Sequence, residues 1–128
     1  MFKEIIFTEK APKPIGPYSQ AVRVGDLLFL SGMLAINPAT GKVEGTDVKA
    51  QTRRALENAK AILESAGFDL KDVVKATVYL AKPEDYEGMN EVYREYFPEK
   101  QPARTTVSVH FPLKEILVEI DFIAWKRA

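Results

Sequence analysis

A β-strand that is apolar on both faces is predicted by the segment Val73-Val74-Lys75-Ala76-Thr77-Val78-Tyr79-Leu80-Ala81. β-Branched and aromatic residues favour extended backbone, and successive side chains of a strand point to opposite faces. One face would carry Val74, Ala76, Val78 and Leu80, and the other would carry Val73, Thr77 and Tyr79. A strand of this kind belongs inside a sheet that is covered on both sides.

Two amphipathic helices are expected, one before and one after this strand. Residues 46–66 repeat apolar side chains at helical spacing, with Thr46 as the expected N-cap and Gly67 as the expected C′ residue. Pro83 would open the second helix at its first position. The apolar stripe of that helix consists of Tyr86, Met89, Tyr93, Tyr96 and Phe97.

Further strands are predicted at residues 5–7, 18–24, 27–34, 102–109 and 117–126, with a tight turn at Gly25-Asp26. Strands mixed with two helices indicate an α+β fold, a two-layer sandwich of one mixed β-sheet with both helices on one face. Two helices cover only one face of so wide a sheet, so we expect another copy of the chain to cover the second face. This predicts a homo-oligomer with a closed, barrel-like centre and ligand sites between subunits.

The composition of the chain argues against several classes of function. The 128 residues are expected to form a single domain, 1–128, and the formal net charge of +0 argues against a nucleic-acid partner. The chain has no cysteine, and its one histidine, His110, lacks companion ligands at zinc-site spacing, so no metal is expected. The N-terminus shows no signal features and no apolar run is long enough to span a membrane, which predicts a cytoplasmic protein.

Arg104 is the most informative polar residue, because it interrupts a predicted buried strand in Pro102-Ala103-Arg104-Thr105-Thr106-Val107-Ser108-Val109. A buried guanidinium cannot lose its proton and therefore needs an anion. Glu119, on the mostly apolar last strand, is one candidate partner, which would make the two residues a structural ion pair. The alternative is that Arg104 binds a ligand carboxylate and Glu119 acts on water.

Three other positions have both a structural and a functional interpretation. Asn90 falls on the apolar stripe of the second helix, where it would satisfy backbone groups or bind a ligand. Tyr18 would be a core or interface residue, or would point its hydroxyl into a cleft. Ser31-Gly32 would be a bulge, or a place where backbone N–H groups approach a ligand.

Several segments, in their order and spacing, resemble the RidA family, also called YjgF/UK114 or reactive-intermediate (imine) deaminases. They are Ala11-Pro12 followed by Ile15-Gly16-Pro17-Tyr18-Ser19-Gln20-Ala21, then Leu30-Ser31-Gly32, Gln51-Thr52-Arg53, Asn90-Glu91-Val92-Tyr93, Pro102-Ala103-Arg104 and Val118-Glu119-Ile120. The resemblance implies a chorismate-mutase-like fold and a homotrimer with a central β-barrel and three clefts between subunits. It also implies hydrolysis of reactive 2-imino acids, such as those formed from 2-aminoacrylate, to 2-oxo acids and ammonia. No cofactor is implied.

Carried over to this chain, the resemblance makes Arg104 the anchor of the substrate carboxylate and Glu119 the residue that activates water. Substrate-binding positions would be Tyr18, Ser31, Gly32, Asn90, Arg104 and Thr106. Thr106 stands where the family often has cysteine, so a covalent role is excluded, although its backbone groups can still hold a water or the imine nitrogen. Met33 and residues 108–113 also depart from the commoner pattern, which would alter the cleft rim and the substrate range.

Two other functions stay open. Family members have also been described as ribonucleases or translation inhibitors, and the balanced charge of this chain disfavours such a role. A non-catalytic carboxylate-binding protein would need Arg104 but not Glu119.

Overall fold

The computed structural model describes residues 2–127 of the chain. The strands are β1 (Glu4–Ile6), β2 (Ala21–Val24), β3 (Leu27–Leu30), β4 (Met33–Leu34), β5 (Val73–Leu80), β6 (Ala103–Ser108) and β7 (Val118–Trp125). The helices are α1 (Val48–Ser65) and α2 (Tyr86–Tyr96), and two 3₁₀ turns, Leu70–Asp72 and Pro83–Asp85, precede β5 and α2. Pro83 therefore begins a 3₁₀ turn that leads into α2 and does not begin the α-helix itself.

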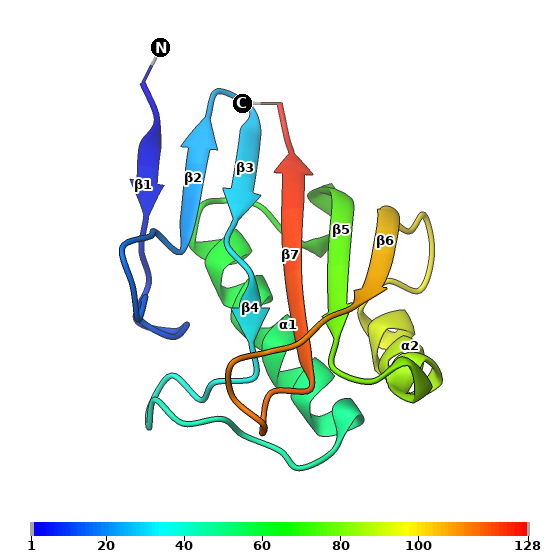
Figure 1. The fold of residues 1–128 in the computed structure, drawn as a ribbon. Helices are drawn as coiled ribbons and strands as arrows, with labels where there is room; N and C mark the ends of the chain where they lie inside the picture. The colour runs from blue at the N-terminus through cyan, green and yellow to red at the C-terminus, as the bar shows by residue number, and fades with distance from the viewer. Residues whose placement is uncertain (1, 128) are drawn as a thin grey trace.

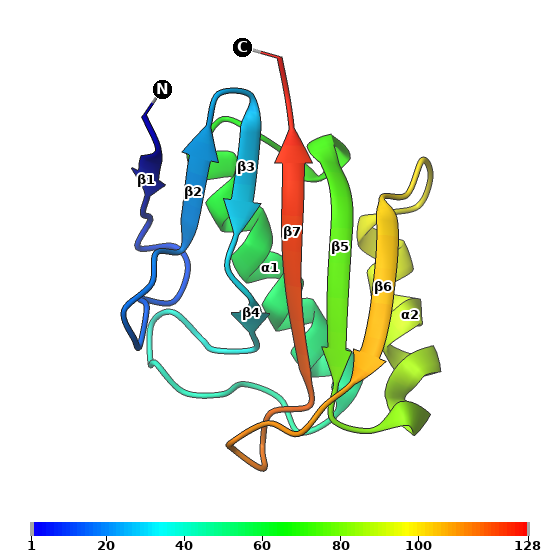
Figure 2. The ribbon, with the colours of Figure 1, turned by 45° about the horizontal axis from the view of Figure 1, so that its top comes forward.

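The strands form one seven-stranded sheet in the order β1-β2-β3-β7-β5-β6, and β4 pairs with β7 beyond the end of β3. Only β5 and β6 pair in parallel among these strands, so the sheet is mixed. Both helices lie against the same face of the sheet (Figures 1 and 2). The predicted α+β sandwich is confirmed. No helix within residues 2–127 is long and apolar enough to cross a membrane.

The core lies between the sheet and the two helices. The β5 side chains that face it are Ala76, Val78 and Leu80, and each is at most 2% exposed. The first part of β5 differs from the prediction because a bulge lies between Val73 and Lys75. The bulge turns Val73 into the core and leaves Val74 47% exposed, which exchanges their predicted faces.

The ends of α1 are set by local hydrogen bonds. Asp47 is the N-cap, not Thr46, because its Oδ1 accepts a hydrogen bond of 2.8 Å from the backbone N–H of Ala50. At the other end Gly67 has a φ of +83°, the left-handed conformation expected of a C′ glycine. The helix therefore begins one residue later than predicted and ends where its sequence indicates.

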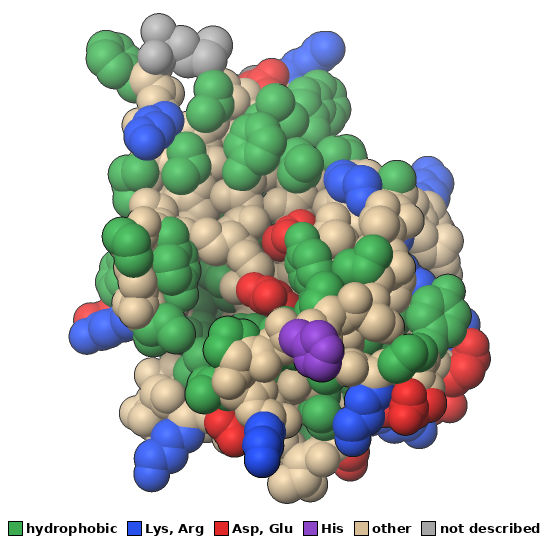
Figure 3. All heavy atoms as spheres, in the orientation of Figure 1, with side chains coloured by type: hydrophobic (Ala, Val, Ile, Leu, Met, Phe, Trp, Pro, Cys, Tyr) green, Lys and Arg blue, Asp and Glu red, His purple; other side chains and the backbone are tan. Residues whose placement is uncertain are grey.

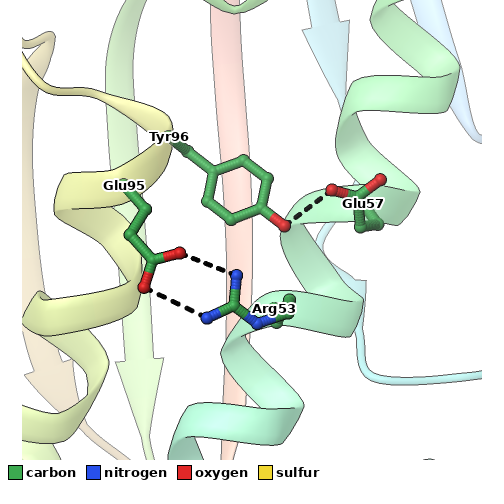
Figure 4. A network of polar contacts seen from close by, with 4 residues as sticks. All are labelled: Arg53, Glu57, Glu95 and Tyr96. Carbon is green, nitrogen blue, oxygen red and sulfur yellow. Dashed lines mark hydrogen bonds and ion pairs between the residues drawn. The ribbon is translucent and has the colours of Figure 1, made fainter.

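Polar contacts join the exposed sides of the two helices (Figure 4). Arg53 of α1 donates two hydrogen bonds, of 2.8 and 3.1 Å, to the carboxylate of Glu95 on α2. The Tyr96 hydroxyl donates a 2.6 Å hydrogen bond to Glu57 of α1. Lys49 and Glu91 form a further ion pair at 2.6 Å. Exposed ion pairs of this kind contribute little each to the stability of the fold.

The face of the sheet opposite the helices is uncovered in the single chain. Figure 3 looks onto this face and shows hydrophobic side chains gathered across it, with acidic side chains among them. By strand alternation the exposed apolar side chains on this face are Ile5, Leu27, Phe29, Val107 and Trp125, which are 37–54% exposed. So large an apolar surface is typical of a protein–protein interface.

The first hairpin follows the predicted turn at Gly25-Asp26, but its strands are shorter than predicted. β2 begins at Ala21, so Tyr18 lies in the preceding loop, where its N–H bonds back to the carbonyl of Gly16 at 2.9 Å. The predicted strand 27–34 is divided into β3 and β4. Phe29 pairs with Ile123 and Met33 with Ile120, so the segment gains one residue relative to β7, and Ser31-Gly32 form an irregular link between the two strands.

Candidate functional site

Arg104 lies on β6, an edge strand, and is half-buried in the single chain. The expectation that this strand is covered is wrong for one chain, because β6 pairs only with β5 and its outer edge has no neighbour among residues 2–127. Arg104 is opposite Ala76 of β5, whose side chain is in the core, so the guanidinium lies on the helix side of the sheet.

The contacts of Arg104 are all with uncharged groups of α2. Its guanidinium carbon lies 4.7 Å from the ring centroid of Tyr93 and 5.7 Å from that of Tyr86. Its two terminal nitrogens lie 3.8 Å from the sulfur of Met89 and 3.4 Å from the hydroxyl of Tyr86. No carboxylate of residues 2–127 forms an ion pair with Arg104. The cation is therefore held in place and keeps its full charge for a ligand.

A cavity of about 270 Å³ opens beside Arg104, between α2 and the segment that leads into β6. Asn90 and Tyr93 of α2 and Gln101 line it together with the guanidinium. The Oδ1 atom of Asn90 and the hydroxyl of Tyr93 are buried, and neither has a hydrogen-bond partner. Buried polar atoms in folded proteins almost always have partners. The Tyr93 hydroxyl lies next to the Arg104 guanidinium, so the Oδ1 atom of Asn90 is the candidate for contact with a bound molecule.

Glu119 lies on β7, on the face of the sheet away from the helices. It is opposite Tyr79 of β5, and its neighbours Val118 and Ile120 point into the core. Its carboxylate lies against Gly32: a Cβ built on Gly32 would be 2.7 Å from the carboxyl carbon of Glu119 and would overlap one carboxylate oxygen. The glycine thus provides the space that the Glu119 side chain occupies.

The surroundings of Glu119 disfavour its charged form. Burial raises the pKa of the Glu119 carboxyl above its ordinary value, and the negative charge of Asp121 raises this pKa further. Asp121 accepts a 2.9 Å hydrogen bond from the hydroxyl of Tyr79, and this bond raises the pKa of Tyr79. A half-buried carboxyl with a raised pKa is suited to accept and release protons.

Tyr18 and Ser31 lie on the loops next to Gly32. The Ser31 hydroxyl donates a 2.6 Å hydrogen bond to the carbonyl of Ser19, and Tyr18 lines a small pocket with Gly32 and Met33. Tyr18 is 48% exposed, and its hydroxyl accepts a long 3.3 Å hydrogen bond from the N–H of Ile15. The predicted residues Tyr18, Ser31, Gly32 and Glu119 are therefore close together in one region.

Gln20 organises this loop, a role that was not predicted from the sequence. It is 1% exposed, accepts a 2.7 Å hydrogen bond from the N–H of Thr8, and donates 2.9 Å bonds to the carbonyls of Thr8 and Pro12. The prolines of this loop leave fewer backbone N–H groups to pair with its carbonyls, but nothing in the sequence marked Gln20 as their partner.

The structure does not bring all the predicted site residues together in one chain. One group lies at the β6 edge of the sheet, on the face that the helices cover. It consists of Arg104 and the half-buried Thr106 on β6, with Asn90 on α2 beside them. Glu119 lies on the opposite face, with Gly32. The predicted ion pair between Arg104 and Glu119 is absent from the described residues, because the sheet separates the two side chains. Each chain thus carries two separate groups of candidate residues.

Comparison with known proteins identifies the family. Residues 8–126 match the family model described as endoribonuclease L-PSP. The chain belongs to this family. It is the YjgF/RidA family, so the resemblance noted in the sequence is confirmed.

Relatives of this L-PSP family member align over nearly its whole length. A RutC family protein of Pyrococcus horikoshii is 56% identical over 125 residues, 98% of this chain and 99% of the relative. Reactive Intermediate Deaminase A of Arabidopsis thaliana is 44% identical over 122 residues, 95% of this chain and 65% of the relative. The crystal structure of Escherichia coli TdcF with bound serine has a TM-score of 0.90 at 40% identity, covering 96% of this chain and 98% of that one.

No group of three or more His, Cys, Asp or Glu side chains within residues 2–127 is arranged to hold a metal ion. The metal-free and cofactor-free site expected from the sequence remains a prediction. The α2 side chains that hold Arg104 were missed as site residues, although Tyr86, Met89 and Tyr93 were recognised as one helical stripe. Their spacing of three and four residues was interpreted as packing against the core. The spacing shows that the three side chains share one face of the helix, but it does not show which residue contacts that face.

Proposed function

We propose that this protein is an imine deaminase, which hydrolyses reactive 2-imino acids to 2-oxo acids and ammonia. The observation that carries the proposal is Arg104, a fixed guanidinium beside a cavity with no carboxylate partner in the described residues. A planar guanidinium binds a carboxylate through two parallel hydrogen bonds. The relative named as a reactive intermediate deaminase and the serine-bound relative support a small amino-acid-like substrate.

The reaction requires only a group that binds the substrate carboxylate and a group that accepts and donates a proton. With the substrate carboxylate on Arg104, a water attacks the electrophilic C2 of the iminium group and Glu119 accepts the proton that the water loses. Glu119 then passes that proton to the nitrogen of the tetrahedral intermediate. As the C–N bond breaks, Glu119 accepts the proton of the hydroxyl group, so that ammonia and the neutral carbonyl of the 2-oxo acid form and leave, and the proton passes from Glu119 to solvent. A carboxyl with a raised pKa suits these proton transfers. Backbone groups of Ser31, Gly32 and Thr106 would position the water and the nitrogen.

The site would form between copies of the chain. Arg104 and Glu119 lie on opposite faces of one sheet, so a substrate can contact both only if each comes from a different chain. The apolar surface of Ile5, Leu27, Phe29, Val107 and Trp125 supports the association of copies through the uncovered sheet face. We propose a homotrimer with a central β-barrel and three such sites, acting in the cytoplasm without a cofactor.

The test is hydrolysis of 2-iminopropanoate generated in place by an amino-acid oxidase. Arg104→Ala should lower kcat/KM by about 100-fold or more, because two charge-assisted hydrogen bonds are lost. The matched control is Arg53→Ala, which removes an equal charge from the exposed Glu95 pair. Equal rates for wild type and Arg104→Ala would refute the anchor, and a wild type no faster than buffer would refute the activity.

The family description favours one other function, cleavage of RNA. A protein with balanced charge, 18 Lys and Arg against 18 Asp and Glu, is poorly suited to hold a polyanion. RNA cleavage that fell steeply with salt, in a preparation inactive on imines, would favour that function. Binding of carboxylates without turnover, unaffected by Glu119→Gln, would indicate a non-catalytic binding protein.

A further inference from the structure

The contacts of Arg104 raise the question of what determines where its guanidinium lies. Long arginine side chains have many rotamers, and a ligand that must first order one loses affinity. Here the side chain lies along one face of α2, over Tyr86, Met89 and Tyr93, which are spaced three and four residues apart. Such spacing aligns side chains along one helix face, so the three contacts of the guanidinium are with a single helix.

Tyr93 differs from the other two supports because it is itself fixed. It is 5% exposed and its ring packs against Phe97 with centroids 4.8 Å apart, and Phe97 in turn packs against Phe122 at 5.6 Å. Tyr86, by contrast, is 43% exposed. The guanidinium lies nearer to the Tyr93 ring than to the Tyr86 ring, at 4.7 Å against 5.7 Å. The position of Arg104 is thereby tied to the core of the protein.

Tyr93 supports the cation without neutralising it. Burial raises the pKa of the Tyr93 hydroxyl to about 12, so the phenol stays uncharged at neutral pH. A carboxylate in its place would hold the guanidinium equally firmly but would compete with the ligand. An aromatic ring attracts the cation through its π-electrons and leaves the N–H groups available.

We infer that Tyr93 is a positioning residue, whose ring holds the Arg104 guanidinium ready for a ligand carboxylate. The inference rests on the proposed function, in which that carboxylate belongs to the substrate. The ring, rather than the hydroxyl, does the positioning. The hydroxyl is buried and makes no hydrogen bond of standard geometry, although Arg104 lies near enough to oppose the rise in its pKa, so its removal should not weaken the fold.

The experiment compares Tyr93→Leu and Tyr93→Phe in the imine assay. Tyr93→Leu should raise KM about tenfold with kcat nearly unchanged, because carboxylate binding is weakened equally in the ground and transition states. Tyr93→Phe should restore KM to within about twofold of wild type and should melt at the same or a higher temperature. The control for lost packing is Val92→Ala, which opens the core on the same helix at a residue 2% exposed and should leave KM unchanged.

A second readout does not depend on activity. The Nε–H resonance of Arg104, assigned by its loss in Arg104→Lys, should carry a ring-current shift that Tyr93→Phe keeps and Tyr93→Leu removes. If Tyr93→Leu fails to fold, Tyr86→Leu at the exposed ring should give a smaller rise in KM. An inactive wild type that also fails to bind 2-oxobutanoate would refute the proposed function. An active wild type with an unchanged KM in Tyr93→Leu would refute the positioning role alone.

Discussion

The carboxylate of Glu119 occupies the space that a side chain at position 32 would fill, so the glycine and the acid depend on each other. A methyl group at position 32 would lie 2.7 Å from the carboxyl carbon and 3.0 Å from Cγ of Glu119. We expect Gly32→Ala to turn the flexible end of Glu119 away from its present place. Stability should change little, whereas kcat for imine hydrolysis should fall by about 10- to 100-fold, within the range for a misplaced general base.

A double-mutant cycle separates this effect from a general disturbance of the Ser31-Gly32 link. In a Glu119→Ala background the three atoms that lie nearest to the added methyl group are gone, so adding Gly32→Ala should cause no further loss of kcat. If the fold-losses of kcat for the two single variants multiplied in the double variant, the effect of Gly32→Ala would not act through Glu119.

Glu119→Gln should lower kcat by about 100-fold and stabilise the folded protein at neutral pH. The carboxyl has a pKa raised above 4.5 in the folded protein, so the folded state binds its proton more tightly than the unfolded state. Stability of the wild type therefore decreases as pH rises from about 4.5 through the raised pKa, and the glutamine variant avoids this loss. Urea unfolding at pH 7 and at pH 4 measures the free energy of unfolding of both proteins. The amount by which Glu119→Gln is more stable than wild type should be smaller at pH 4. A variant less stable than wild type at pH 7 would show that the carboxylate is stabilising.

Gln20→Leu should destabilise the protein by about 2–4 kcal/mol, since it leaves the N–H of Thr8 and the carbonyls of Thr8 and Pro12 without their partner in a partly buried place. Urea unfolding gives the free energy. Gln20→Glu is the informative companion, because it keeps an acceptor for the N–H of Thr8 but directs a carboxylate at two carbonyls, and it should be at least as destabilising. A loss below about 0.5 kcal/mol for both variants would mean that water replaces the amide.

Mixing two inactive variants should restore activity. If each site takes Arg104 from one chain and Glu119 from the next, random trimers refolded from equal amounts of Arg104→Ala and Glu119→Gln contain about a quarter of intact sites. Each variant refolded by itself is the control and should stay inactive. A mixture no more active than these controls would place both residues in a site within one chain, or in no shared site.

Much of the fold could be predicted because each element carries its own signal. The 3.6-residue period of α1, the alternation in β5 and β7, and the glycine after α1 all act locally, and the structure follows them. The errors are local too. Asp47 displaced Thr46 as the cap because its carboxylate reaches the N–H of Ala50, and the bulge in β5 exchanged the faces of Val73 and Val74.

The candidate site was less predictable, because it depends on which face of the sheet each residue occupies. Arg104 and Glu119 were both recognised as polar residues in apolar strands. The alternation of side chains along one strand does not show which of its faces is aligned with a given face of the neighbouring strand. A parallel β5–β6 pair and an antiparallel β5–β7 pair place the two side chains on opposite faces. The support of Arg104 by α2 likewise depends on contacts between segments distant in sequence.

An arginine surrounded by neutral groups also constrains how the proposed reaction ends. Hydrolysis changes the nitrogen-bearing carbon and leaves the carboxylate untouched, so the product retains the group by which the substrate is bound. Binding energy shared by substrate and product does not speed the chemical step. No carboxylate of residues 2–127 forms an ion pair with Arg104, so the 2-oxo acid would leave by diffusion or be displaced by solvent anions or by the carboxylate of the next substrate. If the proposed activity holds, the 2-oxo acid should compete with the substrate for Arg104, and turnover should be fastest where another enzyme consumes the 2-oxo acid as it forms.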